Sequence, residues 1–266
     1  MMRRLLLASA LAAPGAHAAL PLWEAGVAAG TASTPAYPGA EARASRTLAL
    51  PFLIYRGEVL RSDQGGVGAR LLHTEQADVD VGFSLSLPSH SRDDAARAGM
   101  PDLGTLFEFG PRVKFKLADP RWQIELPLRS VIEVRGGLHR VGWTFEPKLA
   151  LRLRGEEDHS QVEAHLGVMA GDQGVNRYFY EVAPQYATAA RPAYQARAGL
   201  LLVRAGLSAA WRVHPSVRTF SFLRYDAYAH AANADSPLMQ RRSGLSLGVG
   251  AAWTLAQSGV PARQSD

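Results

Sequence analysis

Hydrophobic and polar residues alternate along most of the chain. In the segment LFEFGPRVKFKL (106–117), every second residue belongs to an apolar set and the residues between them to a polar set. The apolar set is Phe107, Phe109, Pro111, Val113, Phe115 and Leu117, and the polar set is Glu108, Gly110, Arg112, Lys114 and Lys116. The pattern recurs in DVDVGFSLSLP (78–88), RWQIELPLRSVIEVR (121–135), RVGWTFEPKLALRLR (140–154) and SGLSLGVGAAWTL (243–255). A period of two residues predicts β-strands.

The length of these segments indicates the kind of sheet. Several alternate for eleven to fifteen residues, whereas strands of soluble proteins most often have about five or six. A tilted strand that crosses a bilayer needs about this greater length. We therefore predict an all-β protein, a transmembrane antiparallel up-and-down β-barrel. A soluble sandwich or lipocalin-type barrel also alternates, but with its polar face outward.

The strand count is about twelve, with ten as the alternative because the two segments within 57–73 are short. The expected strands are 22–31, 46–56, 57–63, 66–73, 77–87, 104–118, 121–135, 139–154, 160–181, 194–213, 216–230 and 242–255. With the N-terminus in the periplasm, the tight connections are periplasmic and the long polar loops lie outside, as in bacterial barrels.

All five tryptophans fall on the apolar set of their segment. They are Trp23, Trp122, Trp143, Trp211 and Trp253. Amphipathic rings favour the headgroup level of a membrane, so we expect an aromatic girdle. The alternative is that they are ordinary core tryptophans.

The first nineteen residues, MMRRLLLASALAAPGAHAA, have the composition of a secretory signal peptide. Arg3 and Arg4 precede an apolar run, and Ala16-His17-Ala18 is a small-x-small cleavage site. Since no segment reaches 18 consecutive apolar residues, no helical span is expected. We predict a signal peptide at 1–19, a barrel at 20–255, a polar C-terminal tail at 256–266, and location in the bacterial outer membrane.

The polar face of the central strands is rich in basic residues. The predicted basic wall consists of Arg112, Lys114, Lys116, Arg129, Arg140, Lys148, Arg152 and Arg154. A charge on the lipid face at the midplane costs about 2–4 kcal/mol per Arg or Lys, so these side chains are expected to face the lumen. An open lumen of this kind favours anions. The alternative is a plugged or narrow barrel whose charges pair across strands.

Catalytic, cofactor and metal sites are not predicted. The chain has no cysteine, its eight histidines are scattered, and its basic residues form no exposed stripe for nucleic acid. Glu156-Glu157-Asp158-His159 is expected to be a solvated turn. The pairs His90-Ser91 and His159-Ser160 are adjacent residues, which point to opposite faces of a strand. Asp93, Asp94 and Asp102 lack the spacing of an EF-hand loop.

Three segments resemble the MipA/OmpV family of outer-membrane proteins. They are LPFLIYRGEVLRS (50–62), RDDAARAGMPDLG (92–104) and the final GVGAAWTL (248–255). The resemblance, which extends from about Trp23 to Leu255, implies a barrel that is a non-enzymatic scaffold. Its implied partners are a murein-hydrolysing lytic transglycosylase and a penicillin-binding protein. The basic lumen supports a different function, a passive channel for small anionic or polar solutes, and a barrel hydrolase is the third.

Overall fold

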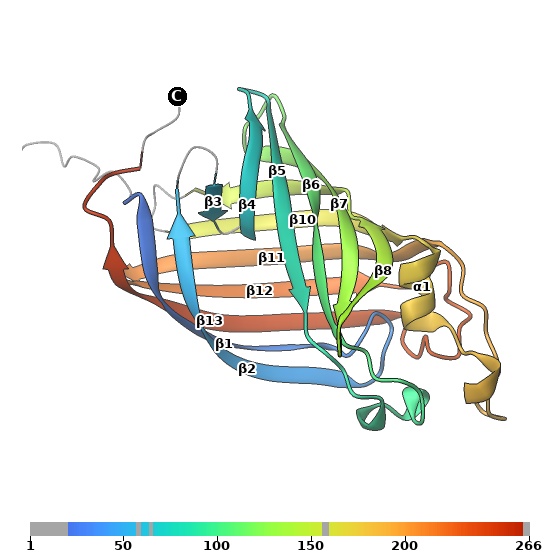
Figure 1. Ribbon diagram of the computed structural model, residues 1–266. Coiled ribbons are helices and arrows are strands. Elements are labelled where there is room, and N and C mark those ends of the chain that lie inside the picture. Colours follow the sequence, from blue (N-terminus) through green and yellow to red (C-terminus); the bar gives the residue numbers. More distant parts are fainter. Residues whose placement is uncertain (1–20, 57–59, 64–65, 156–159, 263–266) are drawn as a thin grey trace, which may run out of the picture.

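The computed structural model describes residues 21–56, 60–63, 66–155 and 160–262. The strands in these ranges form one large antiparallel sheet (Figure 1). Its strands are β1 (Trp23–Pro35), β2 (Arg43–Tyr55), β3 (Leu60–Asp63), β4 (Gly66–His73), β5 (Ala77–Ser86), β6 (Thr105–Lys116), β7 (Trp122–Val134), β8 (Leu138–Phe145), β9 (Lys148–Arg154), β10 (Ser160–Gly171), β11 (Gly199–His214), β12 (Val217–Ala227) and β13 (Ser243–Gln257). The predicted all-β antiparallel architecture is confirmed.

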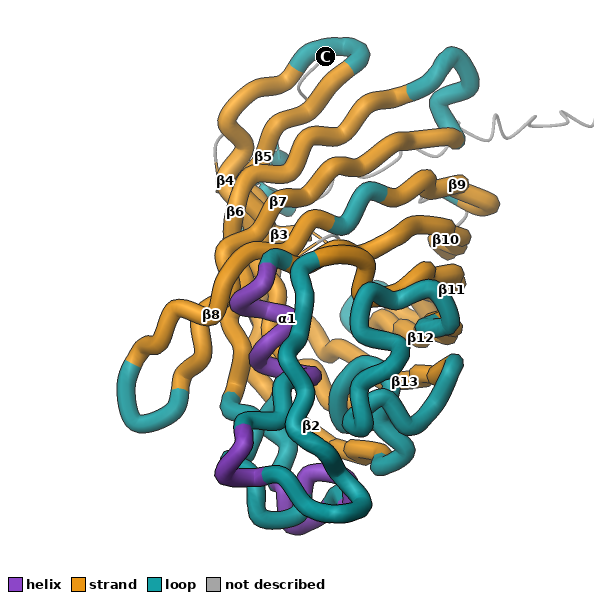
Figure 2. Tube along the Cα trace, turned by 90° about the vertical axis from the view of Figure 1, so that its right-hand side faces the viewer, coloured by secondary structure: helices purple, strands orange, loops and turns teal. Residues whose placement is uncertain are grey.

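Nearly every strand pairs with its neighbour in the chain. The order in the sheet is β2-β1-β13-β12-β11-β10-β8-β7-β6-β5-β4-β3. The ladder between β1 and β13 joins the first strand of the chain to the last, and the sheet curls round on itself (Figure 2). The edge strands β2 and β3 contact each other, and within the described residues no ladder joins them.

The strands β8 and β9 continue one another and cross the sheet as one strand. Both pair with β7 and β10, the register is the same on the two sides of the break, and only Glu146 and Pro147 separate them. Proline has no N–H to donate to a ladder, which explains the break. Counted in this way the sheet has about twelve strands, so the predicted number is confirmed and the alternative of ten is wrong.

The two faces of the sheet differ in polarity. One face carries exposed apolar side chains, which include Val27, Leu53, Phe83, Leu85, Leu166, Leu207, Leu223, Leu247 and Val249. The other face buries carboxylates and guanidinium groups, among them Glu24, Glu108, Arg112, Glu125 and Asp226. A charged side chain that faces lipid is costly in free energy. The buried charged face is therefore the interior of the barrel, and the apolar face is its exterior.

The end of the barrel opposite the start of β1 and the end of β13 is covered by a cap of loops and one helix (Figure 1). The segments 36–42, 87–104, 172–198 and 228–242 supply its residues. Helix α1 (Gln173–Tyr180) begins where the Asp172 carboxylate accepts a hydrogen bond from the Val175 N–H. The prediction of a strand as far as residue 181 is therefore wrong from Asp172 onward. In the described part of the chain, no helix has the length and apolar character to span a membrane.

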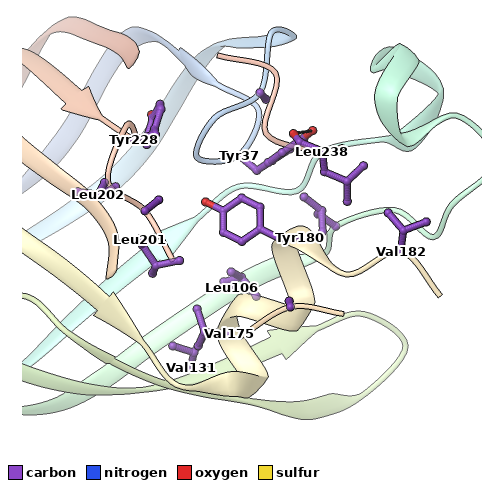
Figure 3. Close-up of a cluster of buried hydrophobic side chains, with 14 of the residues drawn as sticks. Tyr37, Leu106, Val131, Val175, Tyr180, Val182, Leu201, Leu202, Tyr228 and Leu238 are labelled. Carbon is purple, nitrogen blue, oxygen red and sulfur yellow. Dashed lines mark hydrogen bonds between the residues drawn. The ribbon is translucent and has the colours of Figure 1, made fainter. Parts of the chain in front are cut away.

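The cap has its own hydrophobic core (Figure 3). Tyr180 lies at its centre, and Tyr37, Val182 and Leu238 surround it, all of them buried. The Tyr37 hydroxyl donates to the Leu238 carbonyl at 2.9 Å, and the Tyr180 hydroxyl donates to the Pro38 carbonyl at 3.1 Å. Burial, together with the carboxylate of Asp94, raises the pKa of Tyr37 far above its ordinary value. The cap is thus packed in the manner of a protein interior.

Replacing Leu238 tests the packing of the cap. Leu238 is 0% exposed, so Leu238→Ala leaves a cavity and is expected to cost about 2–5 kcal/mol. The expected result is rapid protease cleavage of the loops at 181–198 and 228–242. Leu138→Ala is the matched control, because Leu138 is 74% exposed at the same end of the barrel, and it should be cut at the wild-type rate. Equal rates for the two variants would contradict a packed cap.

Candidate functional site

The barrel interior holds an ion-pair network with residues on β6, β7, β11 and β12 and one, Glu146, on the link between β8 and β9. The Arg204 guanidinium, on β11, donates to Glu146 at 2.5 Å and to Asp226 of β12 at 2.7 Å. Glu146 also accepts from Arg129 of β7 at 3.1 Å, and Arg129 lies 3.8 Å from Glu108 of β6. Carboxylates and guanidinium groups therefore alternate along the network.

Two further ion pairs lie between this network and the open end of the barrel. The Arg112 guanidinium of β6 donates to both oxygens of Asp80 on β5, each at 2.8 Å. The Lys114 ammonium lies 3.6 Å from Asp80. On the neighbouring strands, Lys148 lies 3.1 Å from Glu125. The cross-strand register places each base opposite or diagonal to its acid.

Burial decreases along the interior from the cap to the end that carries the chain termini. On β6, Leu106 is 4% exposed and Arg112 is 7% exposed. Lys114 is half-buried, and Lys116 at the end of the strand is exposed. The described interior is therefore filled toward the cap and open to solvent at the other end.

The eight residues of the predicted basic wall have different surroundings in the structure. Arg112, Lys114, Arg129 and Lys148 belong to the ion pairs above. Lys116, Arg152 and Arg154 are exposed near the open end, and Arg152 stands opposite Glu163. Arg140 stands opposite Ile132, and its guanidinium lies 5.5 Å from the centre of the Trp143 ring. That all eight line one lumen wall stays a prediction.

The sequence pattern missed two of the five residues of the central network, Arg204 and Asp226. Glu108, Glu146 and Arg129 lie on segments with clear alternation, whereas Arg204 and Asp226 lie on β11 and β12, where small and aromatic residues share the inward positions with the charges. Arg224 and Asp226 are two residues apart, so the sequence already places these two charges on one face of a strand. Their partners on other strands depend on register, which alternation alone does not determine.

The tryptophans occupy two levels of the barrel. Trp23, Trp122, Trp211 and Trp253 lie on strand ends near the chain termini, and Trp143 lies near the cap, where its carbonyl accepts from the N–H of Asp172. Trp143, Trp211 and Trp253 are 39–46% exposed on the exterior. Their function as an aromatic girdle stays a prediction.

The loop between β5 and β6 brings together three of the polar residues considered for catalysis. The Asp102 carboxylate lies 3.0 Å from the His90 Nδ1 and accepts from the Ser91 N–H at 2.7 Å and from its hydroxyl at 2.9 Å. These hydrogen bonds, from His90 first and Ser91 second, hold the pKa of Asp102 well below its ordinary value. The His90 ring and the Ser91 hydroxyl both contact Asp102, and no hydrogen bond joins them to each other in the described structure, so they do not form a base–nucleophile pair. The cluster stabilises the fold of the loop.

The remaining candidates from the sequence are not brought together. Asp93 is exposed, and Asp94 accepts from the Ala96 N–H at 2.9 Å. The turn at 156–159 lies outside the described residues, so the pair His159-Ser160 is not placed. Among the residues that are described, no three His, Asp or Glu side chains are grouped in a way that holds a metal ion.

Breaking the central network tests how much it stabilises the barrel. In Arg204→Met, Glu146 and Asp226 lose their shortest ion pairs inside the barrel. Loss of one partner from a buried pair costs about 3–5 kcal/mol. The expected result is a lower free energy of unfolding in urea, measured by tryptophan fluorescence in lipid vesicles.

The matched control is Arg241→Met. Arg241 pairs with Glu41 on the cap, and both side chains are more than half exposed, so this change is expected to cost about 0–1 kcal/mol. An Arg204→Met protein as stable as the control would mean that the network does not contribute to the stability of the barrel.

Solved structures of other proteins are similar to this chain. The chain is similar in fold to a structure described as the CymD monoaromatic hydrocarbon channel, at 9% identity, with 90% of each chain covered and a TM-score of 0.39. It is also similar to outer membrane phospholipase A from Escherichia coli, at 10% identity, with 87% of this chain and 92% of that chain covered and a TM-score of 0.35. No curated protein sequence matches the chain.

The family comparison extends over most of the chain. The family model described as MltA-interacting protein MipA matches residues 27–255. The apolar exterior, the charged interior and the long antiparallel strands are those of a bacterial outer-membrane β-barrel. The chain belongs to the family of the MltA-interacting protein MipA.

Proposed function

We propose that the protein is a non-enzymatic outer-membrane scaffold that presents its periplasmic turns to peptidoglycan-remodelling enzymes. The partners that we propose are a lytic transglycosylase and a penicillin-binding protein. The family description names an interaction with MltA, which supports a protein partner. The observation that carries the proposal is the packed cap, because a barrel closed at its outer end is better suited to holding a partner than to passing solutes.

The end of the barrel that carries the chain termini has the surface that a partner would meet. Its turn at 117–121 holds Arg121 against Asp119 at 2.7 Å, with both side chains exposed. Hydrogen bonds from Arg121 hold the pKa of Asp119 below its ordinary value. Arg152 and Arg154 are exposed at the end of β9 in the same region. A surface with this basic character favours a partner with an acidic face.

A passive channel is the second function that an observation favours. Interior bases become progressively more exposed toward the open end, where Lys116 and Arg152 meet solvent. A basic entrance of this kind attracts small anions. The cap core, with Tyr180 and Leu238 at 0% exposure, opposes free passage.

The scaffold proposal predicts that charge at the turns controls partner binding. The double variant Arg121→Glu and Arg154→Glu is expected to bind the purified lytic transglycosylase at least tenfold more weakly than wild type, because it reverses two exposed charges. The measurement is biolayer interferometry with the barrel in nanodiscs. Arg241→Glu, on the cap, should bind as wild type does. Failure of the wild-type barrel to bind either enzyme would refute the scaffold proposal.

Conductance separates the two functions. We expect the refolded barrel to give no discrete steps in a planar bilayer, because the cap closes one end. A channel instead predicts anion-selective steps whose selectivity falls in Arg152→Glu, since that residue is exposed near the entrance. Steps of this kind would replace the scaffold by the channel as the main function.

A further inference from the structure

A β-bulge in β8 changes the face of the sheet on which Arg140 lies. β8 pairs with β7 in one register as far as Gly142, and the ladder then skips Val141. The next pair is Arg140 with Ile132. In an unbroken register Arg140 would instead stand opposite Glu133, which is buried. A bulge re-aims the side chains that follow it, and bulges of this kind are common at the rims of barrels.

The face that carries Ile132 is the exterior of the barrel. Leu128 and Val134 lie on the same face of β7 and are 42% and 47% exposed. The residues on either side of Ile132 in the chain, Val131 and Glu133, are buried. Because side chains alternate between the two faces of a strand, Ile132 points outward, and its ladder partner shares that face.

The contact between Arg140 and Trp143 is independent evidence for this face. The guanidinium lies 5.5 Å from the centre of the indole ring, and Trp143 is exposed on the exterior. Residues three positions apart on a regular strand point to opposite faces, so the contact requires the extra residue of the bulge. That residue, Val141, packs against the core of the cap. The cap therefore fixes the bulge, and the ring holds the planar guanidinium by a cation–π contact.

Arg140 is a charge set among apolar side chains. Exposed apolar residues lie on the same face on both sides of it, with Leu138 toward the hairpin tip and Phe145 on the other side. Among the residues that the structure describes, none forms an ion pair with Arg140, and its charge contacts the Trp143 ring. An arginine on the lipid side of a barrel is costly in free energy unless it reaches the headgroup level or an anion. The chain supplies no such anion here, so its source is the surrounding lipid.

We propose that Arg140 and Trp143 bind a phosphate group of an outer-leaflet lipid, in place of the lumen position that alternation predicts for Arg140. The cap end is the outer end of the barrel when the short turns are periplasmic, and tryptophan rings gather at the headgroup level. A guanidinium donates two parallel hydrogen bonds to a phosphate. The apolar side chains on both sides favour a lipid, whose acyl chains they contact, over free phosphate. The proposal is independent of the scaffold function, which uses the turns at the other end.

The test uses lipid A, which carries phosphates and acyl chains on one disaccharide, and the mature barrel in dodecyl maltoside. Native mass spectrometry measures the affinity. Arg140→Gln is expected to bind lipid A about tenfold more weakly than wild type, because it removes a charge-assisted contact with phosphate. Arg241→Gln is the matched control, since it removes the same charge from an exposed ion pair on the cap, and it should bind as wild type does. Equal affinity in these two variants would overturn the proposal.

The phosphate and its source are tested separately. Lipid A without its phosphates is expected to bind wild type and Arg140→Gln equally, and a difference that persists would overturn the phosphate site. Inorganic phosphate in excess, at constant ionic strength, is not expected to displace lipid A, and displacement would overturn the lipid as the ligand. Trp143→Leu should also weaken lipid A, because the guanidinium loses the ring that holds it. Heat-modified migration in gel electrophoresis shows that each variant is folded.

Discussion

The rest of the structure depends on the placement of charge relative to lipid. A guanidinium or ammonium group at the lipid-facing midplane costs about 2–4 kcal/mol, and the chain carries 29 such groups among its 266 residues. Alternation directs the charges of the spanning strands to one face, and closure of the sheet turns that face inward. Charges that are brought together inside must then pair with each other. The network around Arg204 and Glu146 is the result of this constraint.

The features that follow from alternation were predictable from the sequence. β6, β7 and β13 lie close to their predicted ranges, because long alternation fixes both strand type and face. The partners within the interior were not predictable. The pairing of Arg204 with Glu146 joins residues 58 positions apart and skips the strand between them, so it depends on register and on closure. One-residue changes of register would reverse every face.

The cap shows a second limit of the sequence pattern. The sequence pattern predicts one strand over residues 160–181. In the structure β10 ends at Gly171, and Gln173–Tyr180 forms a helix. The indication in the sequence was Asp172, a good N-cap residue, directly before the segment. The burial of Tyr180 depends on loops that are distant in sequence, such as the one that carries Tyr37. No local pattern contains that information.

The two sides of the interior impose different requirements on the same barrel. On the charged side, carboxylates and guanidinium groups pair with each other across strands, as they do around Arg204 and Glu146. On the apolar side, glycine on β13 makes room for the rings of Phe220 and Phe222, and Leu50 on β2 remains more than half exposed. The two sides of the interior therefore differ in what holds them together, because ion pairs across strands connect the charged side and aromatic rings over glycine connect the apolar side.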